Sequence, residues 1–145
     1  MKRLSIFLFA LIVLDTAAFA LTPKKHDAPK AVIEAFAQKF PLAQKVKWEK
    51  EKSDYETNFI VNGVPASANF APDGKWMETE ADINVSNVPK IVVEGIHAAY
   101  PGSTIVAASQ IETPDAGLHY EADIMNGRKK SEVLFDALGK EIKQQ

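Results

Sequence analysis

Histidines and paired carboxylates are the residues of this chain whose types and spacing could do chemistry. His119, Glu121 and Asp123 alternate, so on a β-strand they would share one face and offer three metal ligands. Residues two apart on a strand stand about 7 Å apart, which is wide for a compact zinc site. A solvated polar face is therefore the favoured interpretation, and we expect no metal.

Carboxylate pairs such as Glu49/Glu51 and Glu78/Glu80 raise the question of general acid–base catalysis. That chemistry needs a cleft and a shifted pKa, whereas alternating charges on a strand usually mark its hydrated side. The turn at Asp73 lacks the acidic spacing of a calcium-binding loop and is better explained as a hairpin. The chain has no nucleophile elbow, phosphate loop or dinucleotide fingerprint. We therefore expect no catalytic residues and no cofactor, and conclude that the protein is not an enzyme.

Composition narrows the class of protein further. The 145 residues include no cysteine, which excludes disulfides, a thiol nucleophile and thiolate-bound metals. The formal net charge of −2 gives no electrostatic reason to expect nucleic acid, which binds concentrated basic surfaces. The fold must therefore be stabilised by packing, and the partner must be sought among other classes of molecule.

The first twenty residues have the pattern of a secretory signal peptide. Lys2 and Arg3 precede an apolar run over 4–14, and Ala18 and Ala20 place small residues where a signal peptidase cleaves, before Leu21. The run is shorter than the roughly 20 apolar residues of a membrane span, so we expect no membrane insertion after cleavage. Residues 1–20 are thus predicted to be removed, and 21–27 to form a flexible leader. The exported protein would be periplasmic or secreted, and both addresses stay open.

Two amphipathic helices are predicted sixty residues apart. Apolar residues recur four apart in both, at Val32, Phe36 and Phe40 in the first and at Val92, Ile96 and Tyr100 in the second. A proline follows each stripe directly, which ends a helix. The sequence therefore repeats one design.

Strands are predicted after each helix, because the period at which apolar residues recur changes from four to two. Asn62-Gly63 and Asn126-Gly127 are hairpin signals, and Gly74-Lys75 and Gly139-Lys140 recur at the end of each series. So many matches in one order predict a duplicated unit, 28–85 and 86–145, within one compact domain. The expected fold class is α+β, with two tandem repeats, each one helix packed on an antiparallel three- to four-stranded sheet. Whether the sheet is continuous across the repeats is left open.

A family resemblance rests on motifs in residues 32–80, namely Lys39-Phe40-Pro41, Lys45-Val46-Lys47-Trp48-Glu49, Tyr55-Glu56, Asn62-Gly63, Asp73-Gly74-Lys75-Trp76 and Glu78-Thr79-Glu80. With them the segment resembles the PepSY-like family of small exported bacterial proteins, which is grouped with beta-lactamase-inhibitor-like domains. The second half resembles the pattern more loosely, with Ala108 in place of Trp48 and Glu141 in place of Trp76. The resemblance implies a helix on an antiparallel sheet in tandem, and a binding or inhibitory role. In beta-lactamase inhibitor proteins the exposed sheet surface grips the target, which implies that an exposed sheet face is the surface to test.

Strand alternation predicts which side chains point away from the helices. With Phe59 and Ile124 facing the helices, and Met77 aligned with Ile142 as inward residues, four apolar side chains point outward, namely Ile60, Trp76, Met125 and Leu134. Polar residues are interleaved with them, namely Glu56, Asn58, Glu121, Asp123 and Glu132. Because exposed apolar clusters mark protein contacts, these four residues are the predicted partner-binding site.

The sequence therefore predicts an exported, non-enzymatic binding module that engages a protein or peptide through this face, with inhibition as one form of that role. Two alternatives stay open. The first is a structural or self-associating envelope protein whose outward face is a homo-oligomer seam. The second is a sensor of small ligands or metals.

Overall fold

The computed structural model describes residues 28–143, which form two α-helices, one short 3-10 helix and seven β-strands. Their order along the chain is α1 (Lys30–Lys39), β1 (Gln44–Glu51), β2 (Asp54–Val61), β3 (Val64–Phe70), β4 (Trp76–Ile83), η1 (Val85–Asn87), α2 (Lys90–Ala99), β5 (Thr104–Thr113), β6 (Gly117–Asn126) and β7 (Lys129–Asp136). The α+β class is confirmed. The signal peptide and leader predicted for 1–20 and 21–27 lie outside the described residues.

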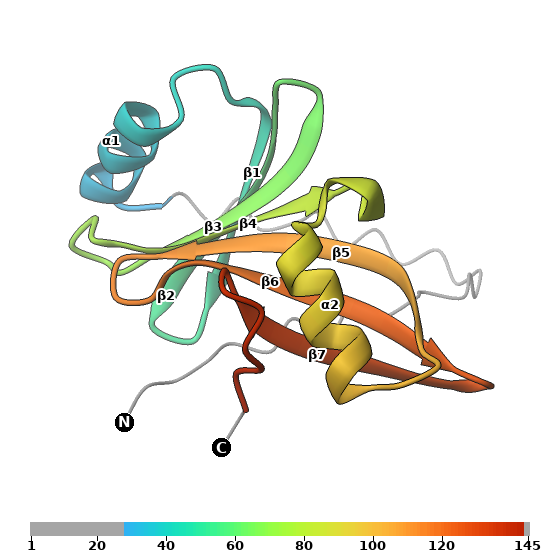
Figure 1. Cartoon of the computed structure of the whole chain (residues 1–145). Helices are drawn as coiled ribbons and strands as arrows, with labels where there is room; N and C mark the ends of the chain where they lie inside the picture. The colour runs from blue at the N-terminus through green and yellow to red at the C-terminus, as the bar shows by residue number, and fades with distance from the viewer. Residues whose placement is uncertain (1–27, 144–145) are drawn as a thin grey trace, which may run out of the picture.

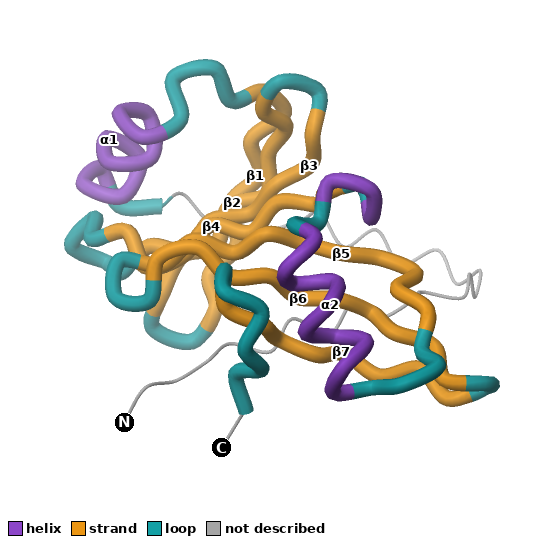
Figure 2. The backbone as a smooth tube through the Cα atoms, viewed as in Figure 1, coloured by secondary structure: helices purple, strands orange, loops and turns teal. Residues whose placement is uncertain are grey.

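All seven strands belong to one antiparallel sheet, in the order β1-β2-β3-β4-β5-β6-β7. Each strand pairs with its neighbour in sequence, and α2 is inserted in the connection between β4 and β5 (Figures 1 and 2). At that junction Ala81 pairs with Gln110, and Ile83 pairs with Ala108. The sheet is therefore continuous from the first half of the chain to the second, which answers the question that the sequence left open.

The two helices begin and end in the same way. A proline, Pro29 or Pro89, occupies each N-cap, and each helix is ten residues long. At the other end, the backbone N–H of Phe40 donates to Phe36 O, and that of Tyr100 donates to Ile96 O, both at 2.8 Å. The helix boundaries therefore follow the prolines and apolar stripes of the sequence.

Both helices cover the same face of the sheet. On β4, Ala81 packs against the buried residues around α1, and Ile83 packs against those around α2. Residues two apart on a strand point to the same side, so one face of the sheet carries both cores. The α1 core consists of Ala28, Val32, Phe36, Phe59, Ala66, Ala68 and Phe70. The α2 core consists of Val88, Val92, Ile96, Ala108, Tyr120, Ala122, Ile124, Val133 and Phe135.

Two glycines lie in turns that pack directly against the helices, one in each half of the chain. A Cβ atom at Gly74 would lie 2.6 Å from Ala31 O, and one at Gly139 would lie 2.3 Å from Ile91 O. Both have positive φ, +89° and +77°, which glycine adopts without strain. At these two turns no residue with a side chain fits without backbone movement.

Trp76 does not point away from the helices, so its predicted place on the outward face is wrong. Asn69 pairs with Glu78 but Phe70 pairs with Trp76, so Met77 is an extra residue in a β-bulge. The bulge turns Trp76 to the side of Phe70, where it packs against the α1 core, and leaves Met77 substantially exposed. The expectation of an inward Met77 is wrong for the same reason.

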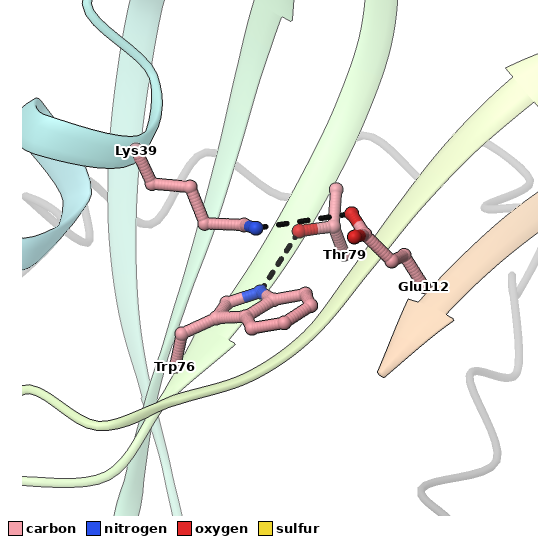
Figure 3. A network of polar contacts seen from close by, with 4 residues as sticks. All are labelled: Lys39, Trp76, Thr79 and Glu112. Atoms are coloured by element: carbon pink, nitrogen blue, oxygen red, sulfur yellow. Dashed lines mark hydrogen bonds and ion pairs between the residues drawn. The ribbon is translucent and has the colours of Figure 1, made fainter. Parts of the chain in front are cut away.

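Trp76 takes part in a polar network on the helix side of the sheet (Figure 3). Its Nε1 donates to Thr79 Oγ1 at 2.9 Å, and Lys39 Nζ lies 3.5 Å from the centroid of its ring. The same ammonium lies 3.8 Å from Glu112 Oε2 on β5. The network therefore links α1 and β4 to the first strand of the second half.

Candidate binding face

The sheet face opposite the helices is lined mainly by polar side chains. On neighbouring strands, Glu49 pairs with Glu56, Glu56 with Asn69, and Asn69 with Glu78. In the next row Asn58 pairs with Ser67, Ser67 with Glu80, and Glu80 with Ile111. In the second half Glu121 pairs with Ser109 and Leu134, and Asp123 pairs with Glu132. We call this surface the acidic face, because Glu56, Glu78, Glu80, Glu121 and Glu132 dominate it.

Few carboxylates of the acidic face form an ion pair with another residue that the structure describes. Among the residues that the structure describes, only Asp123 on this face is in an ion pair, with Lys130 Nζ at 2.9 Å. The helix surfaces differ, because Lys30 pairs with Glu34 and Lys90 with Glu94, at 3.4 and 3.3 Å. Within residues 28–143 the face therefore gathers carboxyl groups with few cations on one side of the sheet.

Burial and mutual repulsion raise the pKa values of four carboxyls on the acidic face. Desolvation, followed by the charges of Glu80 and Glu56, raises the pKa of Glu78 to about 7. Desolvation, followed by the charges of Glu132, Glu80 and Asp123, raises the pKa of Glu121 to about 8. The pKa values of Glu56 and Glu80 are also raised, again mainly by desolvation. The sheet therefore places these carboxyls in a surrounding that disfavours their charged form, so that Glu78 and Glu121 have pKa values near neutral pH.

Two polar side chains on the same face are buried. Asn69 is 9% exposed. It lies between Glu56 and Glu78, on the side opposite its core neighbours Ala68 and Phe70. His119 is 3% exposed; its Nδ1 lies 3.3 Å from Gly117 O, and desolvation lowers its pKa.

The four apolar residues of the predicted partner-binding site do not form one patch. Ile60 and Met125 lie on the face opposite the helices as predicted, but both are partly buried. They belong to β2 and β6, four strands and therefore about 19 Å apart. Their role in partner binding stays a prediction.

Leu134 also lies on the predicted side, opposite Glu121, but is only 4% exposed. The chain end returns beside it, because the backbone N–H of Ile142 donates to Leu134 O at 2.7 Å. The expectation of an exposed Leu134 is therefore wrong, and with Trp76 turned to the other side the four residues do not form one contact surface.

The sequence interpretation missed the acidic face. It placed Glu56, Glu121 and Glu132 among outward polar residues and set Glu78 and Glu80 aside as the hydrated side of a strand. The available signal was that all five share one parity in their strands. What the alternation could not reveal is the partial burial of four of them, all except Glu132, which depends on how the continuous sheet brings the strands together.

The described residues contain no group of three histidine or carboxylate side chains arranged to hold a metal ion. His119, Glu121 and Asp123 do share one face of β6, since they pair with Asp136, Leu134 and Glu132 respectively. The arrangement is best suited to forming ion pairs and hydrogen bonds with a ligand.

A family model described as "Putative beta-lactamase-inhibitor-like, PepSY-like" matches the chain twice, over residues 19–60 and 57–143. The chain belongs to the PepSY-like family. This confirms the resemblance found in the sequence. No curated protein matches the chain.

Solved structures of Bacteroides proteins share the fold. A BLIP-like protein from Bacteroides fragilis is 20% identical, with a TM-score of 0.73 over 82% of this chain and 86% of its own. A DUF2874 family protein from Bacteroides uniformis is 23% identical, with a TM-score of 0.73 over 80% and 87%. A "putative periplasmic" protein from Bacteroides eggerthii is 23% identical, with a TM-score of 0.73 over 82% and 88%. At these identities the likeness shows the fold alone.

The names of the family and of the Bacteroides fragilis and Bacteroides eggerthii structures describe inhibitor-like or periplasmic proteins. Within residues 28–143 no helix is long and apolar enough to cross a membrane. The PepSY-like protein described here is thus similar to inhibitor-like and periplasmic proteins, and its own partner is a matter for proposal.

Proposed function

We propose that this PepSY-like protein is an exported, non-enzymatic binding module that engages a protein or peptide through the acidic face. The observation that carries the proposal is the one-sidedness of the sheet. Both helices pack on one face, whereas the other face presents half-buried carboxyls, of which only Asp123 is in an ion pair within the described residues. Such groups are costly in the free protein and gain partners when a ligand binds.

Export and a binding role agree with the relatives. The signal-like first twenty residues point to export, and the Bacteroides eggerthii relative is described as periplasmic. The inhibitor-like description of the family favours engagement of another protein over catalysis. Inhibition of a target is one form that this binding could take.

The proposal includes a tandem origin for the fold, with one helix and its own strands in each repeat. The family model matches twice, and the two turns at Gly74 and Gly139 carry the same hydrogen bonds. In each turn the backbone N–H three residues before the glycine donates to the carbonyl one residue after it, from Ala71 to Lys75 and from Asp136 to Lys140, at 2.9 Å in both. A duplicated unit accounts for both observations.

Self-association through the acidic face is disfavoured by its charge. Two copies meeting face to face would bring Glu56, Glu78, Glu80 and Glu121 of each against those of the other. Like charges brought into contact and desolvated cost several kcal/mol by general estimates. A partner other than a second copy therefore fits the face better.

A capture experiment tests the binding module. Protein produced from the full chain would be used as bait in an envelope extract of the host, beside a Ser67→Tyr variant. Ser67 lies at the centre of the face, between Asn58 and Glu80, and tyrosine is well tolerated in strands, so the variant obstructs the face without disturbing either core. The matched control is Ala98→Tyr on the exposed side of α2. The proposal expects a partner that the parent and the control retain and the Ser67→Tyr variant loses. Equal capture by all three proteins contradicts it.

A further inference from the structure

We infer that β7 pairs edge to edge and antiparallel with β7 of a second copy of this chain, with Ser131 facing Ser131 at the two-fold axis. The inference does not depend on the proposed function, because it concerns an edge of the sheet and not the acidic face. It combines three observations, namely an open strand edge, a charge pattern that is complementary to itself, and a groove beside the edge.

The outer side of β7 lacks the neighbouring strand that β3 has. Both strands precede a glycine turn, and β3 pairs with β4 over residues 66–70. Along β7 the described residues 28–143 supply only the bridge between Phe135 and Glu141 and the hydrogen bond from Ile142 N to Leu134 O. β7 is the last strand of the sheet (Figure 1). Within this part of the chain, residues 129–133 therefore have no strand on their outer side.

The backbone groups of Lys130 and Glu132 point to this open side. Leu134 O accepts its hydrogen bond from Ile142, so Leu134 directs its backbone groups away from β6. In an antiparallel ladder every second residue does so, which places Lys130 and Glu132 in the same set. A row of such N–H and C=O groups is a template for another strand.

The opposite edge of the sheet is less suited to pairing. The register of β1 with β2 shifts between Gln44 and Lys47, and Lys45 has a positive φ of 55°. Bulges of this kind protect an edge strand from pairing. β7 pairs with β6 from Lys129 to Asp136 without a shift. The regular edge is therefore β7, and a strand that pairs with its own copy closes the assembly at a dimer.

The charges of β7 select both the second copy and the register. Lys130 and Glu132 are exposed and lie on the same side of the sheet. With Ser131 facing Ser131, each Lys130 lies opposite Glu132 of the second copy, and the two exchange backbone hydrogen bonds. A slip of two residues would place Lys130 opposite Lys130 or Glu132 opposite Glu132, and like charges directly opposite destabilise a sheet. The edge is therefore complementary to itself in one register.

A groove beside the edge leaves room for the second copy. The groove is open, has a volume of about 470 Å³, and is lined by Tyr100, residues 132–134 of β7 and residues 141–143. In the inferred register, Arg128 in the hairpin turn of the second copy lies opposite Leu134 and therefore at this groove. Because edge pairing continues the sheet, the two acidic faces lie on the same side of the dimer and stay open.

Sedimentation equilibrium over a concentration series tests the inference. The protein would be produced from the full chain and measured from about 10 μM to about 1 mM, because a short paired edge makes a small and weak interface. We expect a reversible equilibrium between one chain and two. A parent that stays monomeric over the whole range, or an assembly that grows beyond two chains, overturns the inference.

An exchange of charges tests the register. Glu132→Lys brings like charges together across the axis, so we expect it to raise the dissociation constant of the dimer roughly tenfold or more. Adding Lys130→Glu to the same chain makes the opposed charges unlike again and should restore dimerisation. The matched control is Glu34→Lys on the exposed surface of α1, which changes the net charge equally and should leave the dimer unchanged. Thermal melts show which variants are folded. Equal weakening by Glu132→Lys and Glu34→Lys, or no recovery in the folded double variant, overturns the inference.

Amide hydrogen exchange measured by NMR locates the interface without any substitution. The N–H groups of Ser131 and Val133 point to β6, whereas those of Lys130 and Glu132 point to the open edge. We expect exchange at Lys130 and Glu132 to slow roughly tenfold or more as the dimer forms, with little change at Ser131 and Val133. If a dimer forms while Lys130 and Glu132 still exchange rapidly, its interface lies elsewhere and the inference is wrong.

Discussion

The two halves of the sheet have the same backbone plan and different interiors. Around α1 the core is aromatic, and the Phe36 ring lies 5.0 Å from that of Phe59 and 6.2 Å from that of Phe70, both edge to face. The α2 core is largely aliphatic, and Ile96 takes the place that Phe36 has in α1. The glycine turn beneath each helix is kept in both halves. The difference teaches that the helix and turn framework constrains the sequence more tightly than the chemistry of the side chains packed between them.

The helices also differ in how closely they approach the sheet. A Cβ atom at Gly95 would lie 2.1 Å from the carbonyl oxygen of Gly139, whereas the matching position of α1 is occupied by Ala35. The larger aromatic side chains around α1 need more space between the layers. The aliphatic core around α2 permits a closer contact, in which a helical glycine is required.

The ends of the helices are tied to the sheet by different interactions. In the first half Lys39 lies over the ring of Trp76, and in the second the hydroxyl of Tyr100 donates to Glu141. Glu141 follows Gly139 at the same interval as Trp76 follows Gly74. The equivalent positions Trp76 and Glu141 are therefore each linked to the end of the helix above them, by unrelated chemistry.

The largest expected effect comes from removing the central side chain of each core. Phe36→Ala should lower the free energy of unfolding by about 4 kcal/mol, and Ile96→Ala by about 3 kcal/mol, because the former also loses several aromatic pairs. Urea denaturation of both variants measures this. A smaller loss for Phe36→Ala than for Ile96→Ala would mean that the aromatic core is the looser of the two.

A smaller loss is expected at the close approach of α2. Gly95→Ala should lower the free energy of unfolding by about 2 kcal/mol, although alanine is normally the better helix former by about 1 kcal/mol. The comparison is Ala35→Gly in α1, for which we expect a loss of about 1 kcal/mol from helix propensity. If Gly95→Ala instead stabilises the protein, the two helices approach the sheet equally closely.

The acidic face should make stability fall as pH rises from 6.5 to 9. Glu78 and Glu121 have folded-state pKa values of about 7 and about 8, above the ordinary value of 4.5, so the folded state binds more protons than the unfolded state in this range. The lowered pKa of His119 acts only below 6.5, outside this window. After allowance for solvent screening we expect a loss of about 2 kcal/mol, measured by urea denaturation. Glu78→Gln should reduce the loss only below about pH 8, where Glu78 releases its proton, whereas Glu121→Gln should reduce it over the range from pH 6.5 to 9. An unchanged slope in both variants would contradict this account.

The smallest effects are expected at the ends of the helices. Lys39→Met should cost about 1 kcal/mol through loss of the cation–π contact with Trp76. Tyr100→Phe should cost about 1 kcal/mol through loss of the hydrogen bond to Glu141. Glu112→Gln tests how much of the first value comes from the exposed ion pair with Lys39, for which we expect less than about 0.5 kcal/mol. Thermal melts of all three variants beside the parent provide the measurement.

Much of the fold was predictable because its signals are local. The stripes through Phe36 and Ile96, each followed by a proline, predicted both helices. Alternation and the Asn-Gly turns predicted the hairpins, since both depend on a few neighbouring residues. The pairing of β4 with β5 could not be read, because no short-range pattern states which strand edges meet.

The candidate site was only partly predictable, because the alternation of side chains between the two faces of a strand is interrupted by a bulge. One extra residue at Met77 reversed the expected orientation of Trp76. For Leu134 the predicted side of the sheet was right but the predicted exposure was wrong. The chain end near Ile142 returns beside β7, and no pattern within β7 indicates this contact. The significance of the carboxylates lies in their partial desolvation, a property of the assembled sheet that no single strand reveals.

The order of the strands has a consequence for the speed of folding. Every strand pairs with the one before it in the chain, so each step of assembly closes a short loop, apart from the connection that contains α2. Short loops cost little chain entropy, and a low average separation between contacting residues is associated with fast folding. We therefore expect the main refolding phase at the fast end of the range for β-rich domains, with the hairpins of either half able to act as the nucleus. Because the chain has no cysteine, its folding includes no slow step of disulfide formation.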